Sequence, residues 1–309
     1  MLQSELRPDD VPSALKAEKK GNLKVIELGV GTDADAFWFC LKPEARKNDR
    51  RFAFVQRREF RQALSYAVDR EEFARVVFFD AAVPIWGPVT PGNKTWFTPN
   101  LKRYGPDLDK ARAVLRDIGL EDRNGNGVVE AADGTEAQFT VLTQKGIAAY
   151  ERGTTLLKER AAMIGVALNI APLEAGAMIE RLKTSDYEAI YMHPLMTDLD
   201  PAGNMDMWLS SGGAHFWNLE QTTPATDWEK RIDDIMMRQA ATVDLARRRE
   251  LFNEAQEILA ENLPVLYFAA PRLYYAHSTR VTGVVPSVLR PPVLWNADSL
   301  GVTAPPRAN

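Results

Sequence analysis

The sequence predicts an α/β fold, because strand and helix patterns alternate along the middle of the chain. Residues 138–143 alternate apolar and polar side chains as a half-buried strand does, and residues 151–164 follow with helical spacing up to Gly165. Residues 166–170 predict the next strand, which completes a strand–helix–strand unit. With 309 residues, 45% of them hydrophobic, the chain can bury one full core and pieces of another.

The elements before this unit are also visible in the pattern. Residues 23–28 and 37–41 predict two strands joined by a turn rich in glycine and aspartate. Apolar side chains recur every three or four positions over residues 59–78, which predicts one amphipathic helix. The many prolines and glycines of residues 84–106 predict a loop.

Helix caps and breakers define the remaining helices. Asp107 or Asp109 can cap a helix that stops near Gly119. A helix at 178–183 leads into a strand at 187–192. Two late helices each have one apolar face, made of Ile232, Ile235, Met236 and Gln239 in the first and of Leu251, Ala255, Ile258 and Leu259 in the second, which Asp244 can cap and Pro264 ends. Short strands are expected at 265–268 and 273–276.

Charge and composition exclude several classes of function. The net charge of −4 and the absence of a dense Lys/Arg run argue against nucleic acid as a partner. No run of about 18 apolar residues exists that could span a membrane. The single cysteine, Cys40, allows no internal disulfide. The polar residues 1–20 contain no signal core, so we expect any export signal to lie upstream and the chain to be a fragment.

Several segments, in order, resemble one known family. Residues 60–70 read FRQALSYAVDR and are the most specific of them. The others are a helix with spaced aspartate, lysine and alanine (107–115), a helix ending in Ile-Gly-Val (157–166), the strand entry DYEA (186–189) and a closing helix followed by proline (242–264). Together they are similar to the peptide-binding class, family 5, of the extracellular solute-binding proteins of ABC transporters.

The resemblance implies a two-lobed fold of the periplasmic-binding-protein type II kind, with a nearly complete second lobe and a partial first lobe. Residues 1–45 would be a late segment of the discontinuous first lobe, 46–283 the second lobe, and 284–309 the return to the first. It implies a periplasmic or extracytoplasmic, non-enzymatic protein that binds a peptide-like or other small solute between the lobes and delivers it to a membrane permease.

The candidate ligand residues lie between the last strand of the middle region and the late helices. Asp198 resembles the family's aspartate that pairs with the free amino group of a peptide, whereas an ungapped reading puts Thr197 in that role and Asp200 follows before Pro201. Trp208 and Trp217 can offer flat apolar surfaces beside the carboxylate, or belong to the core. A loop aspartate that caps the next helix is the structural alternative for Asp198.

A second candidate site is a calcium loop at residues 122–133. Asp122, Asn124, Asn126 and Asp133 stand at positions 1, 3, 5 and 12 of the pattern, with Gly127 at position 6. Aspartate replaces the glutamate usual at position 12. The alternative is a structural Asn-Gly turn before the next strand.

An enzymatic function is the competing hypothesis. The Gly29-Val30-Gly31 turn after a strand resembles the glycine-rich turn of nucleotide- or S-adenosylmethionine-dependent enzymes. Those folds need a helix to begin at the glycines, whereas here an aromatic strand follows. The 3 histidines show no metal-ligand spacing.

Overall fold

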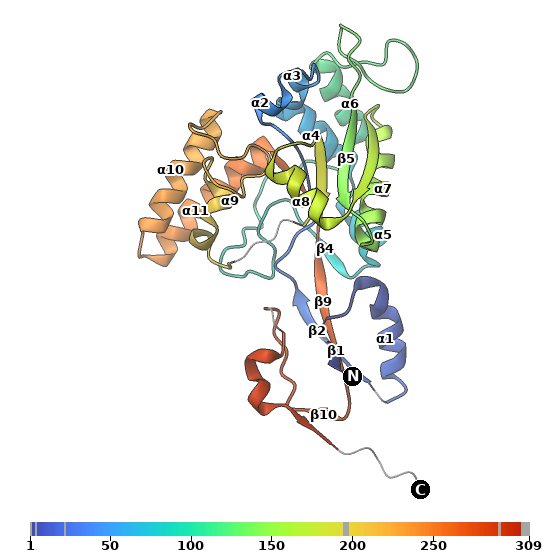
Figure 1. Ribbon diagram of the computed structural model, residues 1–309, viewed down its shortest axis with the longest axis vertical. Coiled ribbons are helices and arrows are strands. Elements are labelled where there is room, and N and C mark those ends of the chain that lie inside the picture. The colour runs from blue at the N-terminus through green and yellow to red at the C-terminus, as the bar shows by residue number, and fades with distance from the viewer. Residues whose placement is uncertain (1, 4, 22, 194–197, 290–291, 304–309) are drawn as a thin grey trace.

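A sheet of five strands lies at the centre of the larger part of the protein in the computed structural model (Figure 1). The structure describes residues 2–3, 5–21, 23–193, 198–289 and 292–303. The strand order is β6-β5-β7-β3-β8. β5 runs parallel to both β6 and β7, and β3 runs antiparallel to β7 and β8. The parallel β5–α7–β6 unit confirms the strand–helix–strand prediction.

The elements have the following bounds. The strands are β1 Leu2–Gln3, β2 Leu23–Val30, β3 Ala36–Phe39, β4 Ala82–Pro84, β5 Gln138–Gln144, β6 Ala167–Leu173, β7 Ala189–Met192, β8 Val265–Tyr267, β9 Ala269–Ser278, β10 Val281–Thr282 and β11 Gly301–Val302. The α-helices are α1 Val11–Glu18, α2 Pro43–Arg46, α3 Phe52–Val55, α4 Arg58–Ala67, α5 Arg70–Phe78, α6 Leu108–Asp117, α7 Ala148–Ala162, α8 Ala175–Lys183, α9 Met205–Trp208, α10 Asp227–Ala241 and α11 Leu245–Asn262. The 3₁₀ helices are η1 Pro8–Asp10, η2 Pro201–Asn204 and η3 Leu294–Ser299.

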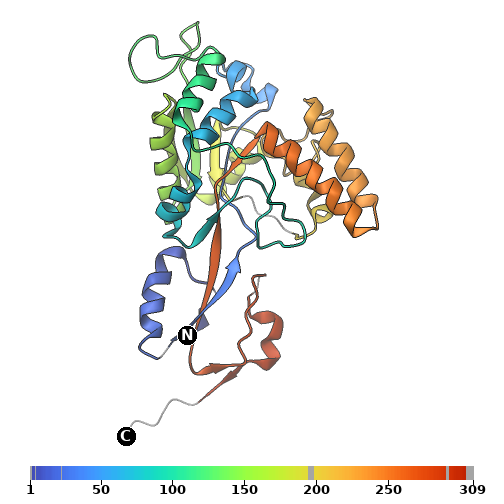
Figure 2. The same ribbon diagram turned by 180° about the vertical axis from the view of Figure 1, so that it is seen from behind.

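Helices cover both faces of the five-stranded sheet, which makes three layers (Figure 2). Successive side chains of β3 point to opposite faces, so Phe37 and Phe39 join one hydrophobic cluster with α4 to α7. Trp38 lies in the other cluster, with α8, α10 and α11. Both faces of β3 are buried, and the strand is therefore apolar throughout instead of alternating apolar and polar residues.

A second sheet leads away from this body. β9 pairs antiparallel with β2 and with the short strands β1 and β4. In Figure 1, β2 and β9 descend together toward the N-terminus, α1 and β10. The chain passes between the two parts after Val30, before and after β4, and again after Tyr267, so several short segments connect them.

The lobe boundaries expected at residues 45 and 283 stay a prediction. Hydrogen bonding places β3 in the five-stranded sheet, although it precedes residue 46. It also places β9 in the second sheet, although it precedes residue 283. In the tail, Trp295 donates from Nε1 to the carbonyl of Val285 at 3.0 Å and remains 61% exposed.

The helix predicted over residues 59–78 is two helices. Val68 is extended, and Asp69 caps α5 by accepting from the N–H groups of Glu71 and Glu72. A side chain that caps a helix N-terminus competes with helix continuation, so the break follows from Asp69. The caps Asp107 and Asp244 are confirmed for α6 and α11.

The two arginines of the FRQALSYAVDR segment are structural. Arg61 is 3% exposed and donates to the carbonyls of Val55, Asn262 and Leu263. Arg70 is 4% exposed, and its guanidinium donates to backbone carbonyls of four separate segments and to a serine hydroxyl. A guanidinium has five N–H donors, which suits it to join several loop ends. The most specific motif in the sequence therefore holds the body together.

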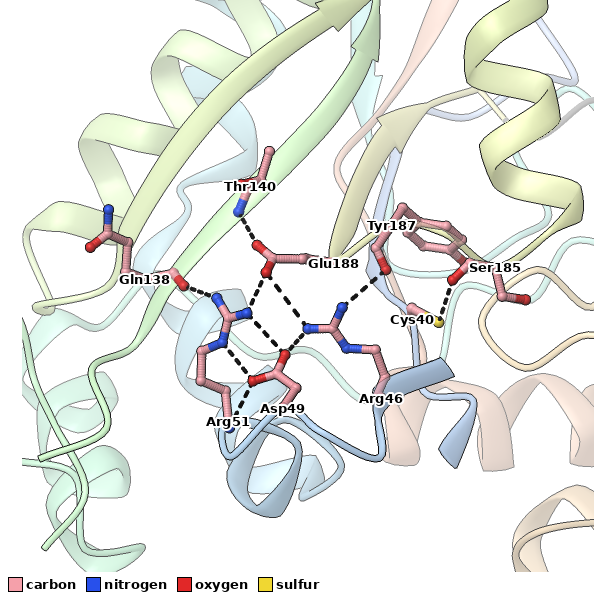
Figure 3. Close-up of polar contacts among 9 residues, drawn as sticks. All are labelled: Cys40, Arg46, Asp49, Arg51, Gln138, Thr140, Ser185, Tyr187 and Glu188. Carbon is pink, nitrogen blue, oxygen red and sulfur yellow. Dashed lines mark hydrogen bonds and ion pairs between the residues drawn. The ribbon is translucent and has the colours of Figure 1, made fainter. Parts of the chain in front are cut away.

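An ion-pair network fixes the segment between β3 and α4 to the sheet (Figure 3). Arg46 and Arg51 both pair with Asp49 and with Glu188, which directly precedes β7. Glu188 also accepts the backbone N–H of Thr140 in β5 at 2.6 Å. Burial raises the pKa of Glu188, but the hydrogen bonds from Arg51 and Thr140 outweigh it, so the pKa is lowered. In the described parts of the chain, no helix is long and apolar enough to cross a membrane.

Candidate functional site

Two cavities lie where the chain passes between the sheets. The first, of about 400 Å³, is lined by Asp198 and by residues of the 88–93 loop, including Thr90 and Asn93. The second, of about 660 Å³, lies against α8 and the end of β7. Asp33 and Leu273 line both cavities, so the two spaces share a wall. Concave spaces of this size are typical of small-molecule sites.

Asp198 lines the first cavity. Its backbone N–H donates to the side-chain oxygen of Asn204 at 3.2 Å, and its carbonyl accepts from the Asn204 amide at 2.7 Å. The carboxylate accepts the N–H of Asp200 at 3.0 Å. The side chain is exposed, so a carboxylate oxygen is available to a cation in the cavity. The sequence-based prediction thus falls on a residue that lines a cavity.

Asp200 has a different position. It accepts the N–H of Ala202 as the cap of η2, and Arg248 of α11 binds both of its carboxylate oxygens. Burial raises the pKa of Asp200, but the hydrogen bonds from Arg248 and Ala202 lower it by more. Asp200 therefore anchors the 198–204 loop to α11. Thr197 lies outside the described residues.

Trp208 and Trp217 belong to the core and not to the cavity walls beside Asp198. Trp208 is 1% exposed, and its ring meets Phe252 edge-on at 5.0 Å. Trp217 is 3% exposed and packs on His215 at 3.9 Å. Neither lines the two cavities. Of the two alternatives, this packing supports the core, because α9 and the following loop turn both rings into the layer between α10, α11 and the sheet.

The second cavity contains a histidine that the sequence did not single out. His193 follows β7, lines this cavity, and places Nε2 3.2 Å from Oδ1 of Asp35. Asp35 is fully buried. Burial raises the pKa of Asp35, and the nearby His193 partly opposes the shift. A signal was present, because Asp35 is a charged residue directly before an apolar strand and His193 directly follows another.

The Gly29-Val30-Gly31 turn does not support a nucleotide or S-adenosylmethionine site. Gly29 has a φ of +97° at an irregularity in β2, where the register to β9 shifts. Gly31 donates to the carbonyl of Pro271 at 2.8 Å, and a Cβ at Gly31 would meet Leu273 at 3.2 Å. The glycines serve strand pairing, and the next element is β3 instead of a helix. No helix N-terminus is therefore available to a phosphate.

In the predicted calcium loop, side-chain oxygens accept backbone N–H groups. Asp122 accepts from residues 125, 126 and 127, Asn124 from residue 126, and Asn126 from residue 128. Asp133 lies in the next turn, accepts from Thr135 and pairs with Arg50 at 3.8 Å. Within the described ranges, no three His, Cys, Asp or Glu side chains are grouped to hold a metal ion. The calcium site stays a prediction.

Comparison with known proteins identifies relatives that match most of this chain. Residues 4–216 match the model of the bacterial extracellular solute-binding proteins, family 5 Middle. A probable ABC transporter-binding protein of Deinococcus radiodurans is 21% identical over 294 residues, which cover 88% of this chain and 47% of that protein. This chain therefore spans about half the length of that relative.

Solved structures share the architecture. The oligopeptide-binding protein AppA of Bacillus subtilis, in complex with a nonapeptide, has a TM-score of 0.79 at 20% identity, and the match covers 97% of this chain and 56% of AppA. The periplasmic binding protein MelB of Agrobacterium fabrum, in complex with stachyose, has a TM-score of 0.84 at 18% identity, and the match covers 98% of this chain and 48% of MelB. These likenesses show the periplasmic-binding-protein fold.

Proposed function

Since the chain belongs to family 5 of the bacterial extracellular solute-binding proteins, we propose that it acts as the substrate-binding component of an ABC importer. It would hold a peptide-like or other small solute between two lobes in the periplasm or another extracytoplasmic space and deliver it to a membrane permease. Members of this family bind solutes and are not enzymes.

The pair of adjoining cavities at the passage between the sheets supports this proposal most. Among the residues that the structure describes, short segments connect the sheets there: the chain crosses after Val30, on either side of β4, and after Tyr267. A narrow connection beside a cavity is the arrangement from which two lobes can close on a solute. The solved relatives fit a solute of this kind, because one is a complex with a peptide and another a complex with an oligosaccharide.

The class of solute is the first point to test. The complete reading frame that contains this sequence would be expressed, and native mass spectrometry would identify what co-purifies. A peptide or other small solute bound at one per protein is the expected result. A protein that carries no solute, and whose melting temperature is unchanged by pools of peptides and sugars, would contradict the proposal.

Asp198 is the residue that we propose for contact with a ligand amine. We expect Asp198→Ala to weaken binding of a peptide with a free amino terminus by about tenfold or more, because a charge-assisted hydrogen bond is lost. The affinity for the N-acetylated peptide should change little in Asp198→Ala. Asp234→Ala is a matched control, since Asp234 lies on α10 and outside both cavities. Equal affinity of wild type and Asp198→Ala for the free peptide would refute the role.

A further inference from the structure

Asp35 is a carboxylate buried at the passage between the two sheets. None of its surface is exposed. Its backbone N–H donates to the carbonyl of Ala269 at 2.9 Å, and its carbonyl accepts from Phe268 at 3.1 Å. Asp35 therefore lies where two of the connecting segments are hydrogen-bonded to each other.

The surroundings of this carboxylate provide one cation-forming group. Among the described residues, neither carboxylate oxygen meets a donor at hydrogen-bond geometry, although the Tyr191 hydroxyl lies near enough to oppose the rise in the Asp35 pKa. His193 places Nε2 3.2 Å from Oδ1. The other titratable groups that face the pair are Tyr191 of β7, Tyr150 of α7 and Asp33 of the same segment.

Burial determines how these groups can be charged. An ionised carboxylate in the interior costs several kcal/mol unless a cation or a proton compensates it. Burial raises the pKa of Tyr150 and of Tyr191, so both phenols stay neutral. Asp35 therefore needs a proton or a cationic neighbour, and His193 is the nearest group that can supply the positive charge.

His193 connects this pair to the second cavity. Its side chain is 22% exposed and lines the cavity, with the ring against Tyr150 at 5.2 Å between ring centres. Most of the wall is apolar, contributed by β7, α8 and the loop with Phe216. Of the other cations in the wall, Arg7 pairs with Asp10, Arg272 pairs with Glu27, and Lys183 stands at the exposed end of α8.

We propose that Asp35 and His193 form a proton-sharing pair that makes the second cavity a site for the carboxylate of a solute with an apolar body. His193 contacts the solute, and Asp35 acts through it as a positioning residue. The inference rests on the proposed function and adds the chemical class of ligand for this cavity. Among the described residues, Nδ1 of His193 is buried and has no hydrogen-bond partner, so one ring nitrogen remains for the solute.

The proton balance follows from the charges. Without solute, the pair holds one proton and is neutral overall. A bound carboxylate adds one negative charge, and the pair takes up one proton from solvent, so that an imidazolium faces the solute while Asp35 is protonated. Imidazole changes charge between about pH 5 and pH 8, and binding should therefore depend on pH in that range.

The test compares two probes of the same shape, a carboxylate and its uncharged amide. Binding of 3-phenylpropanoate and 3-phenylpropanamide to the protein from the complete reading frame is measured calorimetrically at about pH 6 and pH 8, in buffers of different ionisation enthalpy. We expect the acid to bind at least about tenfold more tightly than the amide at the lower pH. We also expect proton uptake with the acid and a smaller preference at the higher pH.

Variants separate a contact from a structural role. His193→Gln should abolish the preference for the acid, whereas His193→Lys should keep it without the dependence on pH. Asp35→Asn should still take up about one proton, but it should move the loss of the preference for the acid to lower pH, because the imidazolium no longer has a carboxylate neighbour. His277→Gln, a histidine of β9 outside both cavities, is the control. If Asp35→Asn does not fold, the two His193 variants decide alone.

The outcomes also distinguish this inference from the proposed function. Equal binding of acid and amide by wild type, or an unchanged preference in folded His193→Gln, overturns the carboxylate site. The carboxylate site is also overturned if neither probe binds to a protein that carries a co-purified solute. In that case the proposed function as a solute-binding protein stands. If no solute of any class binds, the proposed function fails.

Discussion

The buried pair of His215 and Glu229 should contribute strongly to stability, and its loss can be measured. His215 is 1% exposed and Glu229 2%. The imidazole faces the carbonyl of Met207 from Nδ1 at 3.0 Å and the Glu229 carboxylate from Nε2 at 3.2 Å. Both neighbours are acceptors, so both ring nitrogens donate and the imidazole carries a positive charge. The pair holds the loop that places Phe216 in the second cavity.

The change Glu229→Gln keeps the shape and removes the counter-charge. The cation of His215 would then be buried without compensation, which costs about 3–5 kcal/mol of unfolding free energy when one partner of a buried pair is removed. The amide can still accept one hydrogen bond from its neighbours. We therefore expect a loss near the lower end, about 3 kcal/mol.

The dependence on pH gives a second measure of the same pair. Burial raises the pKa of Glu229, but hydrogen bonds from His215, Thr226 and Gln221 outweigh it, so the pKa is lowered. A carboxylate with a lowered pKa in the folded state stabilises fully above its unfolded value of about 4.3. This stabilisation is lost as the pH falls through the folded pKa. The difference between wild type and Glu229→Gln should shrink in that range.

Urea unfolding followed by circular dichroism, from about pH 3 to pH 7, measures both quantities. Glu254→Gln is the matched control, because Glu254 pairs with Arg231 at the surface, where the side chains are 39% and 62% exposed. Exposed pairs contribute about 0–1 kcal/mol. If Glu229→Gln costs no more than Glu254→Gln at pH 7, the assignment of a buried imidazolium is refuted.

Three further changes test the structural roles described above. Arg70→Lys should lower the unfolding free energy by about 3 kcal/mol, because an ammonium cannot reach the carbonyls that the guanidinium joins. Glu188→Gln should cost about 1–3 kcal/mol, because it weakens the contacts of Arg46 and Arg51 with the sheet. Asp122→Ala should cost about 1–2 kcal/mol without calcium, since its carboxylate accepts three backbone N–H groups. Urea unfolding measures all three.

Each of these changes has a result that would contradict it. An Arg70→Lys protein as stable as Arg103→Lys, a change at an exposed arginine, would show that the guanidinium contacts add nothing. Glu174, an exposed acid paired with Lys145, is the control for Glu188. If Glu188→Gln lowers the unfolding free energy no more than Glu174→Gln does, the contacts of Glu188 add nothing to stability. Wild-type stability of Asp122→Ala would contradict its role in the turn. The calcium proposal further needs calcium to raise the melting temperature of wild type and not of Asp122→Ala.

Local patterns in the sequence were sufficient for most of the elements. Period and capping are properties of neighbouring residues, so the parallel β5–α7–β6 unit and the caps Asp107 and Asp244 could be predicted correctly. The same reasoning missed the break at Asp69, because the apolar spacing continues across it while the side chain caps a new helix. The all-apolar strand β3 could be found, but not its position between β7 and β8.

The candidate site depended on contacts that spacing does not encode. Asp198 could be proposed from its segment, and it lines a cavity. Trp208 is equally compatible with a pocket wall and a core, and the packing of α9 decides for the core. Asp35 and His193 are far apart in the chain and meet because antiparallel pairing of β3 with β7 brings Ala36 opposite Met192.

The sequence by itself determined the α/β class, the order of elements and the family, since these depend on local periodicity and on short segments in a fixed order. The tertiary structure decided which polar groups are buried away from solvent. Burial converts Asp35 and Glu229 from ordinary charged residues into paired ones, because a charge in the interior needs a partner that only the folded chain supplies.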